Sequence, residues 1–429
     1  MYLTKEEERM LEGEFGSGVA YSMRVLTKLG DAMDAERMIK PVSSHIVSLG
    51  YQGYGDLAKW CKDLDEKMLD DVKQFRISAT TNPKFFKPED KKLIEKFGMS
   101  SSTVEEIREG VNWSKKFEDL GAIPAYTCTP FFVYPIRKGE HLAGAESVAV
   151  VMYNSIYGAM LNRETGPTAL SSAVTGITPE FGMHKPENRY ARVQVDLDKA
   201  LKPKEFTRAD YSALGYYVGK IAMDRNVVFT GLPKDMSVGL LKTLLAPLGV
   251  SGAVMLAHVV GVTPEAPTLD DALMGRKPEE KIEVGKEQLE EMYGMLTTTT
   301  EDKADIAIFG CPHAPLEEIN EISQLVNGKK IRDDASFLIG TAEPIKVLAD
   351  RMGLTNTIEK CGGLIVTDIC PHLFFNPGFI DIELKHSINT VATDCTKCAH
   401  YVSGFSGGKI KMKYGSVESC INAIAKRGD

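Results

Sequence analysis

The chain has 429 residues, 43% of them hydrophobic and 26% charged, which is ordinary globular usage and enough chain for a large core in two or three lobes. Its formal net charge is −8, from 51 basic and 59 acidic residues, which argues against nucleic acid or an anionic membrane as the main partner. No apolar run approaches transmembrane length and the charged N-terminal segment does not resemble a signal peptide. We therefore expect a cytoplasmic protein whose eight cysteines are thiols or metal ligands rather than a disulfide framework.

Two polar segments near the N-terminus are candidates for contact with a ligand. Residues 41–54 are rich in Ser, Gly and Tyr and include His45, so we predict a loop of the kind that often lines a site. A short strand predicted over residues 75–83 ends in Thr80, Thr81 and Asn82. Short hydrogen-bonding side chains at a strand end suit a turn and a ligand contact about equally.

A polar, helical stretch over residues 84–120 leads into a predicted strand that ends at Cys128. Residues 139–163 follow, and they combine small residues with a helical apolar stripe that polar side chains interrupt. Polar groups on an otherwise buried helix usually have a specific partner. Arg163, at the end of this stretch, is a candidate for binding a substrate carboxylate or phosphate, and a structural ion pair is the alternative.

A cluster of Pro, Lys and Glu over residues 201–206 indicates a boundary between lobes. The next unit is predicted to run helix, strand, helix and buried strand, and then to become charged over residues 268–293, with helix in the second half. We therefore divide the chain into lobes at 1–205, 206–300 and 301–429.

From residue 304 the chain alternates strands and helices with short connections, which is typical of a parallel, doubly wound α/β sheet. The predicted strands end at Cys311, near residues 340–341, at Cys370 and near Asp394. In open α/β sheets, ligands bind outside the carboxyl ends of the strands.

Three cysteines that are far apart in the sequence share one predicted setting. Cys128, Cys311 and Cys370 each follow a short apolar run, and a proline comes one or two residues later. If these strand ends converge, three thiolates could hold one metal centre and leave a coordination position open, as a catalytic metal requires. The alternative is that each cysteine is a small buried hydrophobic residue.

Near the C-terminus, Cys395 and Cys398 form a Cys-x-x-Cys pair beside Lys397, His400 and Tyr401. Such a pair favours zinc or redox chemistry when it stands alone. The sequence contains no second pair of this kind to complete a tetrahedral zinc site, so the zinc interpretation is weak.

Taken in order, these motifs resemble the catalytic large subunit of the aconitase X family, and the resemblance extends over nearly the whole chain. No single motif is diagnostic, but the ordered set is specific. The motifs are Ser44-His45, Thr81-Asn82, Cys128-Thr129-Pro130, Ala145-Glu146-Ser147, Asn154-Ser155, Asn162-Arg163, the Gly-Val-Thr-Pro-Glu-Ala run at 261–266, Gly310-Cys311-Pro312-His313, residues 368–370, and Lys397 with His400-Tyr401.

The resemblance implies an aconitase-like fold of three α/β lobes with mainly parallel sheets around an iron–sulfur site. Cys128, Cys311 and Cys370 match the family's cluster cysteines; we expect a [4Fe-4S] cluster, with [2Fe-2S] as the alternative. The family dehydrates β-hydroxy acids, either mevalonate 5-phosphate or cis-3-hydroxy-L-proline, and the first is favoured narrowly here. A separate small subunit with a swivelling domain and a catalytic serine is the implied partner.

The resemblance also supplies roles for individual residues. His45, Lys397, His400 and Tyr401 are expected to position substrate or deliver protons, and Ser44, Asn82, Ser147, Asn154 and Arg163 to bind substrate. The family more often has other residues where this chain has Cys395 and Cys398, which leaves the substrate open. Two further hypotheses remain: a metal-binding subunit without catalytic activity, and a metal-free α/β scaffold.

Overall fold

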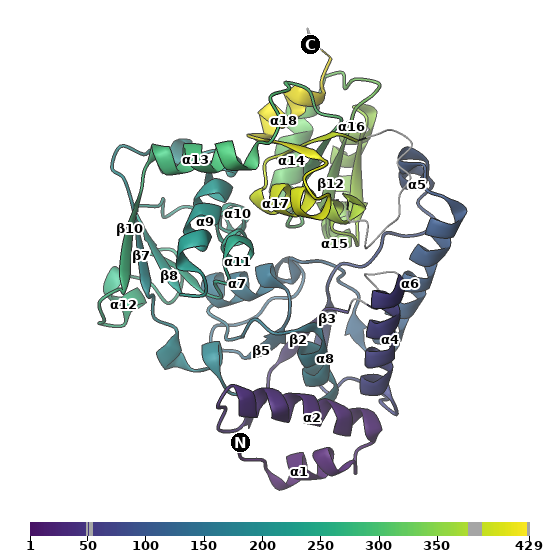
Figure 1. Ribbon diagram of the computed structural model, residues 1–429, viewed down its shortest axis with the longest axis vertical. Coiled ribbons are helices and arrows are strands. Elements are labelled where there is room, and N and C mark those ends of the chain that lie inside the picture. The colour runs from purple at the N-terminus through teal and green to yellow at the C-terminus, as the bar shows by residue number, and fades with distance from the viewer. Residues whose placement is uncertain (49, 51–54, 376–387, 427–429) are drawn as a thin grey trace.

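The computed structural model describes residues 1–48, 50, 55–375 and 388–426, and these form three lobes, each built on its own parallel sheet (Figure 1). The first lobe, in purple and blue, lies at the bottom of that view, the middle lobe at the left, and the third lobe at the top. Among the described helices, none has the length and apolar character needed to cross a membrane. The predicted α/β class with mainly parallel sheets is confirmed.

The first lobe has a four-stranded parallel sheet in the order β4-β3-β2-β5, and a small antiparallel pair, β1 and β6, beside it. Its strands are β1 (Met38–Ile39), β2 (Ser43–Ile46), β3 (Ser78–Thr81), β4 (Ala122–Ile123), β5 (Leu142–Gly144) and β6 (Thr178–Pro179). Its helices are α1 (Lys5–Glu12), α2 (Ser17–Ala32), α4 (Gly55–Leu69), α5 (Lys91–Phe97), α6 (Ser101–Asp119), α7 (Ser147–Ile156) and α8 (Gly166–Thr175).

The loop predicted over residues 41–54 is wrong for its first part, because β2 is a fully buried central strand. Two of its polar side chains, Ser44 and His45, are compatible with burial because they have hydrogen-bond partners from other elements. Ser44 Oγ donates to the carbonyl oxygen of Ala169 at 2.7 Å, and His45 Nδ1 lies 2.8 Å from Thr80 Oγ1. Such long-range partners leave no signal in the local sequence. Positions 49 and 51–54 of the expected loop lie outside the described residues.

The middle lobe has a parallel sheet in the order β10-β7-β8-β9. β7 pairs with β8 and β10 although it precedes residue 205, so we now propose that the lobe boundary lies just before β7. β10, which we did not predict, is an edge strand with alternating exposure inside the charged stretch. The elements are β7 (Val193–Leu197), β8 (Val227–Thr230), β9 (Ala257–Val259), β10 (Glu280–Val284), α9 (Arg208–Ala222), α10 (Val238–Leu245), α11 (Leu248–Ser251), α12 (Leu269–Leu273) and α13 (Lys286–Leu296).

The third lobe has a five-stranded parallel sheet in the order β13-β12-β11-β14-β15, which confirms the predicted parallel sheet of this region. Its last strand, β15, is an edge strand of mixed polarity that the sequence did not reveal. The elements are β11 (Ile306–Phe309), β12 (Ser336–Thr341), β13 (Gly363–Thr367), β14 (Thr390–Thr393), β15 (Lys411–Tyr414), α14 (Leu316–Val326), α15 (Glu343–Arg351), α16 (Leu354–Lys360), α17 (Thr396–Phe405) and α18 (Val417–Ile424). The described residues also include five short 3-10 turns: Pro130–Phe132, Gly182–His184, Pro186–Asn188, Pro203–Glu205 and Pro371–Phe375.

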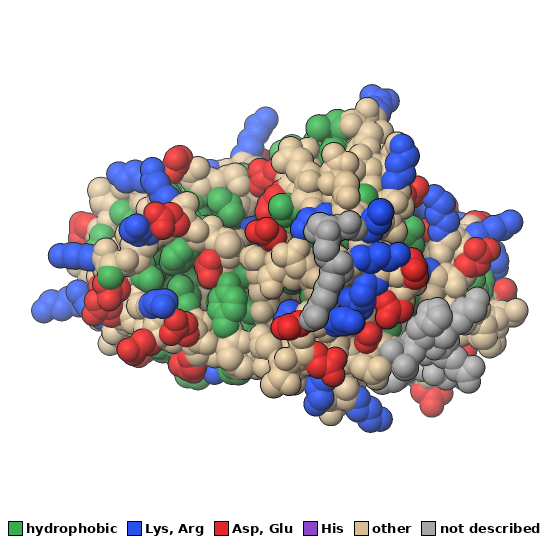
Figure 2. All heavy atoms as spheres, turned by 90° about the horizontal axis from the view of Figure 1, so that it is seen from above, with side chains coloured by type: hydrophobic (Ala, Val, Ile, Leu, Met, Phe, Trp, Pro, Cys, Tyr) green, Lys and Arg blue, Asp and Glu red, His purple; other side chains and the backbone are tan. Residues whose placement is uncertain are grey.

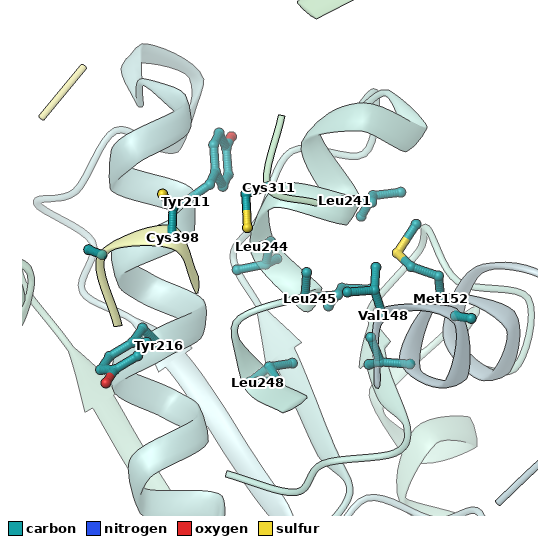
Figure 3. Packing of buried hydrophobic residues seen from close by; sticks show 14 of the residues in the cluster. Val148, Met152, Tyr211, Tyr216, Leu241, Leu244, Leu245, Leu248, Cys311 and Cys398 are labelled. Atoms are coloured by element: carbon teal, nitrogen blue, oxygen red, sulfur yellow. The ribbon is translucent and has the colours of Figure 1, made fainter. Parts of the chain in front are cut away.

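One hydrophobic core runs through the junction of the three lobes (Figure 3). Val148 of α7 faces Leu245 of α10 there, and Tyr211 of α9 lies beside Cys311 and Cys398 of the third lobe. Burying an aliphatic side chain of this size contributes roughly 2 kcal/mol. The thiol-bearing turns of the third lobe are therefore packed against helices of the middle lobe.

The surface viewed from above carries both acidic and basic side chains, with small hydrophobic areas between them (Figure 2). This mixture agrees with the modest net charge of −8. No single-sign field of the kind that attracts nucleic acid dominates this face among the described residues.

Candidate metal centre and its surroundings

Two of the three predicted cysteines follow parallel strands directly. Cys311 comes after β11, and Cys370 comes after β13, with one strand between them in the sheet. Gly310 precedes Cys311 with φ +72, and a Cβ there would lie 2.1 Å from the carbonyl oxygen of Gly340, so only glycine fits this turn. The chain can therefore bend sharply at the sheet edge and present the thiol.

Cys128 reaches the same region by a different route. We predicted a strand up to this residue, but β4 ends at Ile123. Pro124 has no N–H for a ladder bond, and Tyr126 has φ +38, so the chain leaves the sheet before the thiol. Cys128 instead sits in an irregular turn just before the 3-10 turn Pro130–Phe132.

The ligand atoms of Cys128, His313 and Cys370 all lie within 4.8 Å of one another, and this group could hold a metal ion. The Cys370 thiol donates to the Cys128 sulfur, and the backbone N–H of His313 donates to the same sulfur at 3.4 Å. Burial is the largest influence and raises the pKa of Cys128, but the hydrogen bond from Cys370, the charge of Lys397 and the N–H of His313 together leave that pKa below its ordinary value. The hydrogen bond between the two thiols also raises the pKa of Cys370. One sulfur of the pair is thus prepared as a thiolate.

His313 joins the two cysteine turns. Its Nδ1 lies 2.9 Å from Thr127 Oγ1, beside Cys128, and its Nε2 lies 3.0 Å from the carbonyl oxygen of Ile369, beside Cys370. A proton on Nε2 satisfies both contacts, since Nδ1 then accepts from the hydroxyl. Burial lowers the pKa of His313 to about 4, so the ring is neutral. Because both ring nitrogens of His313 already form hydrogen bonds, this residue holds the two cysteine turns together. The thiols of Cys128 and Cys370 are therefore the better metal ligands.

Cys311 lies close to this group but has other nearest partners. Its Sγ is 3.2 Å from His372 Nδ1, the thiol of Cys395 donates to its carbonyl oxygen, and Cys395 and Cys398 both influence its pKa. It contributes electrostatically to the raised pKa of Cys370. The structure therefore brings Cys128 and Cys370 together directly, and places Cys311 beside them in a second group of thiols.

A buried ion pair crosses from the first lobe to the third next to these sulfurs. Lys397 Nζ lies 3.1 Å from Glu146 Oε1. Burial disfavours both charges, but the pair's mutual attraction lowers the pKa of Glu146 and raises that of Lys397. Lys397 also interacts with the sulfurs of Cys128 and Cys311. The positive charge of Lys397 therefore lies where it can offset negative charge on these sulfurs. Glu146 belongs to the Ala145-Glu146-Ser147 motif but was not predicted as a site residue, and it is the N-cap of α7.

The first lobe contributes a neutral, hydrogen-bonded group. His45 and Thr80 are register partners on β2 and β3, and the other ring nitrogen of His45, Nε2, lies 3.4 Å from Asn82 Oδ1. Burial lowers the pKa of His45 to about 4. The ring is therefore uncharged at neutral pH and can accept or donate a hydrogen bond without carrying charge into the site.

Tyr401 and His400 are neighbours on α17 with different surroundings. The Tyr401 ring stacks on His372, with centroids 4.9 Å apart, and lies near Lys397. His400 is turned toward the middle lobe, where its Nδ1 lies 2.8 Å from the hydroxyl of Tyr216. Tyr401 thus faces the candidate centre, and the role predicted for His400 gains no support from this geometry.

The predicted substrate-binding residues fall into two groups: one is exposed near the candidate centre, and the others form hydrogen bonds within the protein. Arg163 is exposed, and its guanidinium contributes to the electrostatics of Tyr401, so it is available near the centre. Asn154 uses all of its side-chain hydrogen-bonding capacity on Leu161, Met255 and Arg189 in this structure, and its contact with substrate stays a prediction. The other two are engaged as well: Ser44 bonds to Ala169, as described above, and Ser147 Oγ lies 3.4 Å from Glu146 Oε1.

Lys242, which no sequence signal singled out, fixes the Cys311 turn from the middle lobe. Its side chain is only 2% exposed, and Nζ donates to the carbonyl oxygens of Pro312 at 3.3 Å and His313 at 3.1 Å. Glu318 Oε1 neutralises it at 2.9 Å. Arg208 forms a comparable pair with Asp394 at 3.0 Å, one residue before Cys395. Charged groups from another lobe therefore hold both thiol-bearing turns.

Three family models match consecutive parts of the chain: the aconitase X first domain at residues 1–187, the second at 190–294 and the third at 304–426. The chain belongs to the aconitase X family. A solved structure, "Crystal structure of Thermococcus kodakaraensis aconitase X (holo-form)", superposes with a TM-score of 0.83 at 31% identity, covering 99% of this chain and 100% of that one. The aconitase-like fold that the sequence predicted is thereby confirmed.

Two kinds of curated relative are similar to this aconitase X chain. The phosphomevalonate dehydratase large subunit of Methanocaldococcus jannaschii is 35% identical over 98% of this chain and 99% of its own length. The cis-3-hydroxy-L-proline dehydratase of Pseudomonas aeruginosa is 28% identical over 97% of this chain but only 69% of its own length. The second relative therefore contains a further portion that has no counterpart here.

Proposed function

We propose that this chain is the large subunit of an iron–sulfur hydro-lyase that dehydrates (R)-5-phosphomevalonate to trans-anhydromevalonate 5-phosphate. The similarity to phosphomevalonate dehydratase large subunits over nearly both full lengths carries this proposal. The paired thiols of Cys128 and Cys370 and the adjacent Cys311 agree with it, because thiolates are the usual ligands of iron–sulfur clusters.

The donor set fits such a cluster. Cys128 is predisposed to the thiolate form, Lys397 is placed to offset the negative charge, and His313 ties the two turns together. When bound, the cluster would supply a Lewis-acidic iron that eases departure of the substrate hydroxyl. We propose Cys128, Cys311 and Cys370 as its protein ligands.

The remaining residues would handle the substrate. The exposed guanidinium of Arg163 would bind the phosphate or carboxylate, since the fork of N–H groups matches either anion. His45 and Asn82, held against each other at the end of β2 and β3, would donate or accept hydrogen bonds at the neutral oxygens. Tyr401 would add a hydroxyl whose pKa burial raises, so that it stays protonated.

Removal of the proton next to the departing hydroxyl needs a base within hydrogen-bond reach. We propose that a serine on a separate small subunit with a swivelling domain provides it. The relatives that are named as large subunits support a second polypeptide. We also propose a cytoplasmic location, where thiols stay reduced.

The proposal is tested by anaerobic purification and iron and sulfide analysis of wild type beside Cys128→Ala, Cys311→Ala and Cys370→Ala, with Cys61→Ala as control. We expect a brown wild type and control, and loss of iron in the other three. Co-expression with the small subunit should then convert phosphomevalonate to a product 18 mass units lighter, the mass of water, as measured by mass spectrometry. A wild type that stays colourless after reconstitution would sink the cluster assignment.

Dehydration of cis-3-hydroxy-L-proline is the second candidate, because relatives of that name match almost the whole chain. The same reconstituted complex, offered both substrates, separates the two. Turnover of the hydroxyproline alone would reverse our preference, and bound iron without turnover of either substrate would point to a metal-binding subunit.

A further inference from the structure

A segment of the first lobe, residues 84–97, lies against the third lobe. Its second half is α5, which Figure 1 shows beside the third lobe. The neighbouring strand there is β13, an edge strand of the third-lobe sheet. An edge strand has backbone groups that no further strand pairs with, and proteins often cover such an edge with a helix or a loop. We call residues 84–97 the arm.

The arm contacts both ends of β13. At the amino end, Lys96 Nζ donates to the carbonyl oxygen of Gly362 at 3.1 Å. At the carboxyl end, the backbone N–H of Lys84 donates to the carbonyl oxygen of Asp368 at 2.6 Å, two residues before Cys370. The arm therefore runs in the opposite direction to β13 and reaches the Cys370 turn.

Three aromatic rings join the arm to the residues that follow Cys370. Phe374, in the 3-10 turn Pro371–Phe375, is only 2% exposed. Its ring stacks on that of Phe97, with centroids 4.7 Å apart and an interplanar angle of 5°, and on that of Phe86 at 5.9 Å. Aromatic pairs have preferred geometries in addition to the area that they bury. The arm thus holds the chain both before and after Cys370.

Lys84 connects the arm to the second cysteine of the pair. Its side chain is buried, and Nζ lies 3.5 Å from the centre of the Tyr126 ring, two residues before Cys128. Nζ also lies 3.7 Å from Glu118 Oε1 on α6. The attraction between an ammonium group and an aromatic face is stronger when both are removed from water. One residue therefore contacts the segments that precede Cys128 and Cys370.

Those two segments each contain a residue with an unfavourable backbone conformation. Tyr126 and Asp368 have φ angles of +38 and +68, in the left-handed region that residues other than glycine rarely adopt. Residues held in this region persist only where the surrounding structure determines their conformation. Lys84 contacts both of them, Tyr126 through its ring and Asp368 through its carbonyl oxygen.

We propose that the arm is a positioning element for the metal centre, with Lys84 and Phe97 as its main positioning residues. It fixes the Cys370 turn relative to Cys128, so that both sulfurs face one ion. The arm itself supplies no ligand and acts through the two turns. This inference rests on the proposed role of Cys128 and Cys370 as metal ligands.

The test is an anaerobic titration of the reduced, iron-free full chain with Cd²⁺ alone, followed by the thiolate-to-cadmium absorbance in the near ultraviolet. Phe97→Leu keeps the space filled and removes the ring, and Lys84→Met keeps the side-chain stem and removes the charge. Substituting residues that orient metal ligands typically lowers metal affinity by about 10- to 100-fold, and we expect a loss of that size in each variant. The absorbance per bound ion should also fall, because one of the two sulfurs no longer reaches the ion.

Three further chains serve as controls. Cys128→Ser/Cys370→Ser gives the binding that does not involve the pair, and this binding is subtracted. Phe229→Leu, at a fully buried position of β8 in the middle lobe, should keep the wild-type affinity and absorbance per ion. Lys84→Arg retains a cation and should recover most of the affinity that Lys84→Met loses.

Wild-type affinity and absorbance per ion in a folded Phe97→Leu or Lys84→Met chain would overturn the role of that residue, and in both chains that of the arm. An equal loss in Phe229→Leu would overturn it as well, since the effect would then be a general one. So would wild-type binding no greater than that of Cys128→Ser/Cys370→Ser. Turnover is not measured, so the arm can fail this test while iron analysis supports the cluster, and can pass it while no substrate is dehydrated.

Discussion

The carboxyl edges of two parallel sheets face the candidate centre, and they are held in opposite ways. The edge of the first lobe is held by neutral hydrogen bonds, such as that between His45 and Thr80 on adjacent strands. The edge of the third lobe is held by buried charges from other lobes, above all Lys242 on the Cys311 turn and Glu146 against Lys397. Polar side chains on adjacent strands can form hydrogen bonds with each other within one sheet. The thiol-bearing turns have free backbone carbonyl groups, so they need hydrogen-bond donors from another lobe.

The largest effect should come from Lys242→Met, which removes the cation that holds the Cys311 turn. The variant leaves Glu318 buried without its partner, and breaking a buried pair in this way costs about 3–5 kcal/mol. Urea unfolding followed by circular dichroism measures the loss. Lys286→Met is the control, because its pair with Glu290 is exposed. A loss no greater than the control's would show that the third-lobe edge does not depend on this charge.

His45→Gln probes the first-lobe edge through pH. The folded chain keeps His45 neutral down to about pH 4, whereas the unfolded chain binds a proton below about 6.5. The stability that depends on the neutral ring is therefore present above pH 6.5 and is lost as the pH falls toward 4, by roughly 3 kcal/mol. The variant should lose less stability over that window. Parallel pH profiles for wild type and variant would contradict the assigned protonation state.

Thr80→Val tests how much the neutral bond itself contributes. The change keeps the shape of the side chain and removes the hydroxyl that contacts His45, so we expect a loss of about 1–2 kcal/mol in the free energy of unfolding. Thr300→Val, at an exposed position, is the matched control and should change stability by less than about 0.5 kcal/mol. An equal loss of stability at both positions would show that the hydrogen bond between His45 and Thr80 does not stabilise the first-lobe edge.

The smallest effect should come from Lys92→Ala. This variant removes an ion pair that joins two lobes but is exposed, so it tests whether an ion pair between lobes stabilises the chain when it is not buried. Lys92 and Glu359 join the first and third lobes at 2.8 Å, but their side chains are 67% and 36% exposed. A pair in water contributes between about 0 and 1 kcal/mol and weakens with added salt. A large, salt-independent loss would mean that crossing between lobes matters more than burial.

The sequence predicted the third lobe better than the first. The apolar runs that end at Cys311 and Cys370 predict buried parallel strands, and the structure has β11 and β13 at these positions. β2 was missed because its residues are polar, and the partners that make its burial possible lie far away in the chain. Local periodicity detects strands that are stabilised by burial, but not strands whose side chains depend on distant hydrogen bonds.

The candidate site shows the same limit. A run of small and apolar residues before a cysteine is visible in the sequence, so three sulfurs could be selected, although their final grouping could not. Lys242 lies in an ordinary helical stretch and reveals nothing of its contact with the carbonyl groups of Pro312 and His313. Asn154 shows the reverse: its polar side chain on a buried helix suggested a substrate contact, whereas the structure shows hydrogen bonds to Leu161 and Arg189 that the sequence did not reveal.

The backbone N–H of His313 donates a hydrogen bond to the Cys128 sulfur and so joins the third lobe to the first. The two residues are 185 positions apart in the sequence. During synthesis, therefore, Cys128 leaves the ribosome long before Cys311, His313 and Cys370 have been made. A metal that needs the complete set can be bound only once these residues exist and the lobes have docked. The order in which the chain is made thus sets the earliest moment at which the centre can be loaded.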